Sequence, residues 1–348
     1  MWNWAGVIIA GMLNGSFAFP LKTARTWRFH HVWMVHSLLA MAVLPWAIVF
    51  VTVERWREIL GGVSARGWLG LMGWGVLFGV GSLLYGVAVD LLGIALGFAI
   101  QLGLSIVLGA LLPMFWAGAF SLRSREDWLF LLGLAVMVAG VVLCAQAGGS
   151  RDVSPERANV SSAKGEVGAQ PAQTARDRFR AGLIVAIIGG ILAPTLNFGI
   201  QYGTALLAKA GEMPGSGRFP AAIYLAWAIF LSAAAFIQAS YCLVSAARAG
   251  QASAFLAPGA GRDAPQVAAM SSLWIASVFI YGRSAFGLGR LGNSFGWPIF
   301  IALIILTSNA WGIILGEWRG AARKAFHRML AGSAVLIVAT FLIGQSKL

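Results

Sequence analysis

The chain has 348 residues, of which 59% are hydrophobic and only 11% are charged, and its formal net charge is +13. With a mean hydropathy of +0.80, this composition excludes an ordinary soluble domain, whose surface needs far more charge. The positive charges are scattered between hydrophobic runs instead of forming a basic patch on a folded domain, which argues against a nucleic-acid partner.

Ten apolar stretches follow one another along the chain, and each is long enough to cross a bilayer as a helix of about 20 residues. The N-terminus lacks the basic region and the small-residue cleavage site of a signal peptide, so the first stretch is interpreted as a retained helix. The sequence predicts an all-α integral membrane protein with transmembrane helices at 4–21, 32–53, 67–89, 94–120, 128–147, 179–207, 220–247, 267–288, 294–316 and 327–343.

A polar segment divides this series in the middle. Residues 148–178 are rich in Ser, Ala, Gly and charge, a composition typical of a disordered linker. The predicted domains are therefore a first five-helix repeat at residues 1–147, the linker, and a second five-helix repeat at residues 179–348.

The two halves resemble each other in sequence. At an offset of 183 residues (197 − 14), Gly6 and Asn14 align with Gly189 and Asn197, and at an offset of 199 the fourth and fifth stretches align without a gap on the ninth and tenth. Five spans per half is an odd number, so the second half is expected to be inverted, an architecture used for alternating access. Lys and Arg are more numerous in loops after odd-numbered spans, which favours both termini outside the cytoplasm.

Motifs of enzymes are missing. We find no phosphate-binding GxxxxGK[ST] loop, no HExxH and no GxSxG. Cys144 and Cys242 lie inside apolar stretches and are interpreted as buried small residues, not as a disulfide or metal ligands. We therefore expect a secondary transporter with no catalytic residues, no cofactor and no metal site.

Polar residues inside the spans are the candidate binding positions, because burying them in a membrane is costly. Amides donate and accept hydrogen bonds, which suits a neutral polyhydroxylated solute, and aromatic faces pack on sugar C–H groups. For the amides the alternative is an interhelical hydrogen bond, and for the aromatic residues it is a place at the membrane interface. The candidate substrate-binding residues are Asn14, Tyr85, Gln101, Asn197, Gln201, Trp297 and Asn309, with Trp74, Trp227, Trp274 and Tyr281 as further stacking surfaces.

Three titratable residues are candidates for proton coupling. His36 lies near the start of the second span, and an imidazole titrates near neutral pH. Asp90 ends the third span and Glu317 ends the ninth, and either could bind a proton if it is partly buried. The alternatives are a structural histidine and carboxylates that are solvated at the headgroup level.

Four segments are similar to the L-rhamnose–proton symporter family (RhaT type) of the drug/metabolite transporter superfamily. They are GMLNGSFAFPLKTARTW at 11–27, LPWA at 44–47, GVGSLLYGVAVDLLG at 79–93 and GEW at 316–318. The matching motif positions are Phe19, Pro20, Lys22, Trp27, Pro45, Trp46, Tyr85, Gly86, Gly93, Gly97, Glu317 and Trp318. Asp90 departs from the family pattern, in which a basic residue is usual, and so does Gln101, where a small residue is expected.

The resemblance covers most of the chain and implies ten helices in an inverted five-plus-five repeat. It also implies proton-coupled sugar uptake across a bacterial inner membrane, with L-rhamnose as the favoured substrate. The alternatives are an exporter of another metabolite, a facilitator of the same superfamily, and a membrane sensor that binds a ligand without moving it. The expected partners are the sugar, the proton and the lipid bilayer, and the oligomeric state stays open.

Overall fold

A computed structural model describes residues 2–20, 27, 29–120, 122–152, 172–212, 219–248, 250, 260–289 and 291–346. Within these ranges the regular structure is helical and contains no strand. The motif residue Lys22 and residues 153–171 of the predicted linker lie outside the described residues. At its two ends the predicted linker is helical, since one helix continues to Asp152 and the next begins at Ala172.

Nine helical stretches in the described residues are long and apolar enough to cross a membrane. They agree with nine of the ten predicted spans to within about two helical turns, which confirms an all-helical, multi-pass membrane protein. The stretches are His30–Thr52, Ala65–Leu92, Leu96–Trp116, Arg125–Ser150, Arg176–Lys209, Ala222–Arg248, Gly261–Gly287, Gly292–Ile314 and Arg323–Gln345.

The first predicted span is a shorter helix, α1 (Trp2–Ser16), of 15 residues. At 1.5 Å per residue it is about 22 Å long, whereas the hydrocarbon core of a bilayer is about 30 Å thick. The tenth crossing and the inverted repeat therefore stay predictions.

The chain folds as two compact units, Met1–Val80 with Pro194–Asn293 and Gly81–Ala193 with Ser294–Leu348. Each unit therefore takes segments from both predicted halves of the sequence. The boundary in the sixth span coincides with a helix break, because α9 (Ala172–Leu192) ends just before Pro194 and α10 (Thr195–Lys209) starts just after it.

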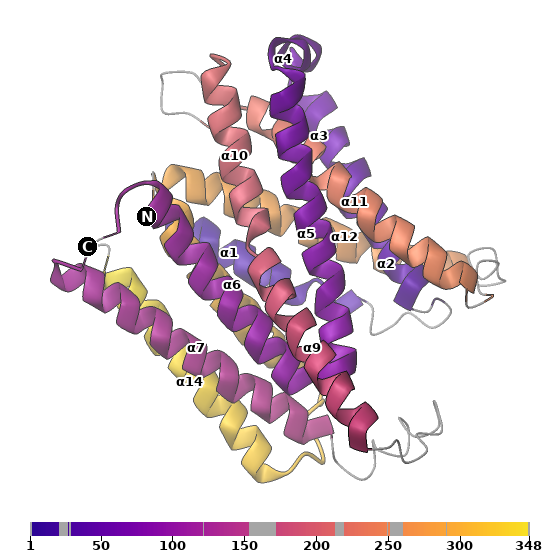
Figure 1. The fold of residues 1–348 in the computed structure, drawn as a ribbon, viewed down its shortest axis with the longest axis vertical. Helices are drawn as coiled ribbons and strands as arrows, with labels where there is room; N and C mark the ends of the chain where they lie inside the picture. Colours follow the sequence, from indigo (N-terminus) through magenta and orange to yellow (C-terminus); the bar gives the residue numbers. More distant parts are fainter. Residues whose placement is uncertain are drawn as a thin grey trace. The chain divides into compact units, whose positions relative to one another are not determined.

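In the first unit, α11 (Ala222–Arg248) is the central helix. The helices α2 (Phe29–Leu38) and α3 (Leu44–Thr52) pack along it, α10 contacts it, and α1 packs on α12 (Ala260–Gly287) (Figure 1). The short α4 (Trp56–Gly62) and the first part of α5 (Ala65–Leu92) complete the unit. Many alanines on α11 are buried, and small side chains of this kind let membrane helices approach closely.

The second span contains a π-helical segment, η2 (Leu39–Val43), directly before Pro45. Proline has no amide hydrogen, and its ring clashes with the carbonyl four residues earlier, here that of Met41. The Leu44 amide bonds instead to the carbonyl of Leu39, five residues back. Insertions of this kind are common at functional sites, and the amide Nε2 of Gln238 lies 3.5 Å from the sulfur of Met41.

In the second unit, α7 (Arg125–Asp152) and α14 (Arg323–Gln345) run side by side (Figure 1). Glycines permit this close contact: a Cβ on Gly140 would lie 2.9 Å from Leu336, and one on Gly332 would lie 2.7 Å from the Cys144 sulfur. The helix α6 (Ile94–Trp116) packs on both α7 and α9, and α13 (Gly292–Ile314) supplies most of the remainder.

Candidate substrate and coupling site

The predicted residues Asn14 and Asn197 both bond to the same helix. The Asn14 amide donates a hydrogen bond of 2.7 Å to the Ser277 hydroxyl, and the Tyr281 hydroxyl donates one of 3.1 Å to the Asn197 side-chain oxygen. Ser277 and Tyr281 are four residues apart and share a face of α12. The structure therefore brings two residues that lie 183 positions apart (197 − 14) to one helix in the first unit.

Local structure positions each of these amides. Asn14 occupies the last turn of α1, and Asn197 the first turn of α10, immediately after the break at Pro194. Both side chains are buried, and so are Ser277 and Tyr281. The observed bonds match the interhelical alternative, and a side-chain amide that makes one such bond keeps capacity for others.

His36 is buried against the same helix, with 1% of its surface exposed. Its Nδ1 lies 3.1 Å from the Ser271 hydroxyl, which itself donates a 2.7 Å bond to the Val267 carbonyl. Since the hydroxyl hydrogen is used there, the oxygen accepts from Nδ1–H. This fixes the neutral tautomer with its lone pair on Nε2. Three aromatic rings surround the imidazole at centroid distances of 5.4–6.0 Å, those of Phe17, Trp33 and Trp274.

The two predicted carboxylates have different surroundings. Asp90 is exposed near the end of α5, and Arg178 donates a hydrogen bond to its backbone carbonyl. Its carboxylate is therefore not buried, although a coupling role would require partial burial. The Glu317 side chain is half-buried and lies, with the indole of Trp318, against Gly312 of α13.

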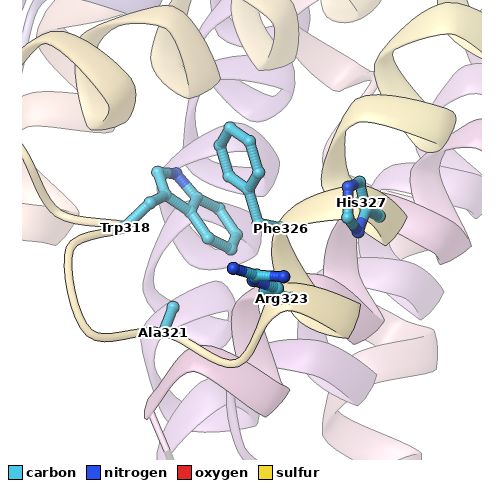
Figure 2. Close-up of a pocket in the computed structure, with 5 residues that line it drawn as sticks. All are labelled: Trp318, Ala321, Arg323, Phe326 and His327. Carbon is cyan, nitrogen blue, oxygen red and sulfur yellow. The ribbon is translucent and has the colours of Figure 1, made fainter.

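Next to Glu317 is a pocket of about 390 Å³ at the start of α14. Figure 2 shows the side chains of Trp318, Arg323 and Phe326 turned toward one another, with His327 beside them. The rings of Trp318 and Phe326 meet edge to face at 6.0 Å. The family motif at 316–318 thus ends at a pocket with aromatic and basic walls.

Four of the predicted substrate-binding residues, Tyr85, Gln101, Trp297 and Asn309, lie in the second unit and take part in helix contacts. Trp297 donates a 3.0 Å bond to the Ser105 carbonyl, one turn after Gln101 on α6. Gln101 is 1% exposed, and its amide Nε2 has no hydrogen-bond partner in the described part of the chain. Its amide lies against Gly189, where a Cβ would collide with it.

Asn309 and Tyr85 also contact neighbouring helices in this unit. The Asn309 amide lies 3.1 Å from the Ser333 hydroxyl and 3.6 Å from the Cys144 sulfur. The ring of Tyr85 meets that of Phe98 edge to face at 4.9 Å. Trp297 therefore bonds to α6 one turn from Gln101, whereas Asn309 and Tyr85 each contact other residues.

Gln201 lines a cavity of about 430 Å³ in the first unit, formed by α10, α11, α12 and the start of α13. Trp227, one of the predicted stacking surfaces, forms part of its wall, and so does Asn293. The polar atoms Gln201 Nε2, Trp227 Nε1 and Asn293 Oδ1 are all buried without a hydrogen-bond partner among the described residues.

Sequence reasoning missed two polar residues of the first unit. Asn293 directly precedes the predicted ninth span and therefore falls outside every predicted helix, yet it lines the cavity next to Gln201. Asp263 lies before the predicted eighth span, yet it is 2% exposed and accepts a 2.7 Å bond from the Trp27 amide. Asp263 lies four residues before Val267 and eight before Ser271, and this helical spacing could have indicated that it shares their buried face.

Comparisons with known proteins agree over the whole chain. A family model described as L-rhamnose-proton symport protein (RhaT) matches residues 1–347. L-rhamnose-proton symporters of Yersinia pestis (strain Pestoides F) and Yersinia pseudotuberculosis serotype O:1b (strain IP 31758) are each 23% identical over 99% of this chain and 96% of the relative. That of Shigella boydii serotype 18 is 22% identical over 97% of this chain and 95% of the relative.

Proposed function

Because the chain belongs to the L-rhamnose-proton symport protein (RhaT) family, we propose that it takes up L-rhamnose together with protons by alternating access. The match over residues 1–347 is the observation that carries the proposal. Relatives similar over nearly their full length are named L-rhamnose-proton symporters. Membership of a symporter family also places the chain among transporters and not among enzymes.

The proposed sugar contacts include Asn14, Asn197 and Gln201, which all lie in the first unit. Asn197 and Gln201 are one turn apart on α10. Asn14 and Asn197 each make a hydrogen bond to a side chain of α12. Tyr85, Gln101, Trp297 and Asn309 stay further proposed contacts in the second unit.

His36 is the proposed coupling residue. Its neutral tautomer has a lone pair on Nε2 that can accept the transported proton, and the ring packs against α12, the helix that also carries the partners of both asparagines. A change of charge at His36 therefore acts on the helix that also positions the proposed sugar contacts. Asp90 and Glu317 are weaker proposals, because they are less buried than His36.

We propose the inverted repeat as the basis of alternating access, with repeats at residues 1–147 and 179–348 joined by the linker at 148–178. Two helix pairs support it. The fifth and tenth spans, α7 and α14, pack against each other, and the second span packs on the seventh, α11. If a twofold axis relates the two halves, a span that lies near the axis packs against the equivalent span of the other half. The fifth and tenth spans are such a pair, and so are the second and seventh.

The proposed location is the bacterial inner membrane, since the relatives are bacterial symporters. The test is uptake of labelled L-rhamnose into proteoliposomes, with and without an inward proton gradient. We expect saturable uptake that the gradient drives above equilibrium. Without saturable uptake of rhamnose the substrate assignment fails, and equal uptake in both conditions removes only the coupling.

A further inference from the structure

The cavity between α10, α11 and α12 is lined by residues with buried polar atoms that have no hydrogen-bond partner in the described part of the protein. Leaving a buried donor or acceptor unsatisfied is unfavourable, and native proteins contain few of them. Here three such atoms belong to residues that line one cavity: Gln201 Nε2, Trp227 Nε1 and Asn293 Oδ1. Their clustering indicates a site that is completed by a ligand.

The hydrogen-bonding character of the wall defines the ligand. The Gln201 amide and the Trp227 indole supply donors, and the Asn293 oxygen supplies an acceptor. The Thr204 hydroxyl donates to the Ile200 carbonyl at 2.9 Å, which leaves its oxygen as a second acceptor. A wall that offers both donors and acceptors matches hydroxyl groups, each of which can donate one hydrogen bond and also accept.

The rest of the wall is apolar, and none of the described lining residues is charged. Phe219 and Phe286 meet edge to face at 5.5 Å, and Phe219 lies 5.8 Å from Trp227. A volume of about 430 Å³ lies within the usual range for small-molecule sites, roughly 300–1,000 Å³. The wall therefore suits a neutral solute that carries both hydroxyl groups and an apolar group.

We infer that this cavity binds the sugar, with Gln201 and Trp227 donating to its hydroxyls and Thr204 and Asn293 accepting from them. L-rhamnose has both hydroxyl groups and an apolar group, because it is a hexose with a methyl group in place of one CH₂OH. The aromatic wall takes the methyl group and the C–H face of the ring. This assignment rests on the proposed transport of rhamnose and adds its binding residues.

Gly282 allows the tight arrangement of the wall. It lies on α12 against the indole of Trp227, and a Cβ at this position would collide with the ring. Trp227 is itself 1% exposed, so its indole cannot move aside without disturbing the core. The close approach of α12 thus holds the indole ring of Trp227 in place beside the cavity.

The experiment measures L-rhamnose binding to the purified full-length protein by calorimetry. We expect Gln201→Leu and Trp227→Phe each to raise the Kd about tenfold, since each removes one hydrogen bond to the ligand. Gln146→Leu makes the same chemical change on an exposed face of α7 and serves as the matched control.

Thermal unfolding without sugar gives a second, independent readout. Gln201→Leu removes an unpaired buried donor, so its Tm is expected to equal or exceed that of the wild type, while its affinity falls. A lower Tm together with an unchanged Kd makes Gln201 a packing residue and overturns the assignment.

The outcomes separate this inference from the proposed function. If the wild type binds and transports rhamnose but both variants keep its Kd, the cavity assignment is wrong and the function stands. If the wild type neither binds nor transports rhamnose, the proposed function fails and the assignment fails with it.

Discussion

The amides of Asn14 and Asn197 illustrate how one residue type can serve both packing and binding. Each makes a hydrogen bond to α12, at 2.7 Å to Ser277 and 3.1 Å from Tyr281. Bonds of this kind between membrane helices stabilise by about 0.6 kcal/mol on average. Their loss alone therefore leaves a folded protein, which makes both positions suitable for mutagenesis.

We expect Asn14→Ala and Asn197→Ala each to raise the Kd for L-rhamnose about tenfold, the effect of one lost hydrogen bond to the ligand. Calorimetric titration measures the affinity, and thermal unfolding monitors the fold. Ser277→Ala is the control for Asn14, because it removes the same interhelical bond and keeps the amide. Equal affinities of Ser277→Ala and Asn14→Ala would assign Asn14 to packing.

His36 offers a residue-scale test of coupling. In His36→Asn the amide nitrogen can still donate to Ser271, but the base at Nε2 is lost. We expect uptake that no longer responds to an inward proton gradient, with rhamnose binding retained. Exposed His327 gives the matched control His327→Asn, for which gradient-driven uptake is expected to persist. Gradient-driven accumulation by His36→Asn would remove this residue from the coupling path.

At the scale of helices, glycine sets the distance between α5 and α11. Gly75 is buried, and a Cβ there would collide with the backbone carbonyl of Phe230. A backbone atom cannot rotate away as a side chain can, so the two helices would have to separate. Gly73, two residues earlier on the same helix, is exposed, and a Cβ there would meet no described atom within 4 Å.

These two glycines therefore form a matched pair. Gly75→Ala is expected to destabilise the protein by about 1–3 kcal/mol, the usual effect of overpacking. Gly73→Ala is expected to be neutral or to stabilise by up to about 1 kcal/mol, because alanine favours a helix. Thermal unfolding in detergent measures both. Equal Tm values for the two variants would contradict the close contact.

At the scale of the whole molecule, the number of crossings depends on α1. If α1 crosses the bilayer there are ten spans, and both ends of the chain lie on the same side. If it does not, the nine long stretches place the ends on opposite sides. The loop charges favour both ends outside the cytoplasm.

Protease-accessible tags joined to Met1 and Leu348 in separate fusions test this count. We expect both tags to be cleaved when protease is added outside intact spheroplasts. Cleavage of one tag alone would exclude ten crossings and, with them, the inverted repeat.

Nine of the membrane helices could be located from the amino-acid sequence alone, because a stretch of about 20 apolar residues indicates a span without reference to its neighbours. It also indicated the family, through motifs in the first three spans and at 316–318. Candidate polar residues were visible too, since an amide such as Asn14 or Gln201 stands out in an apolar helix.

Which of these residues contact one another is visible only in the folded protein. A membrane helix is apolar on most faces, so its periodicity does not reveal which side faces another helix. The bonds from α12 to Asn14, His36 and Asn197 depend on packing between segments far apart in the chain. The same holds for Gln201, Trp227 and Asn293, whose side chains carry unpaired buried atoms, because only the fold brings these residues to the wall of one cavity.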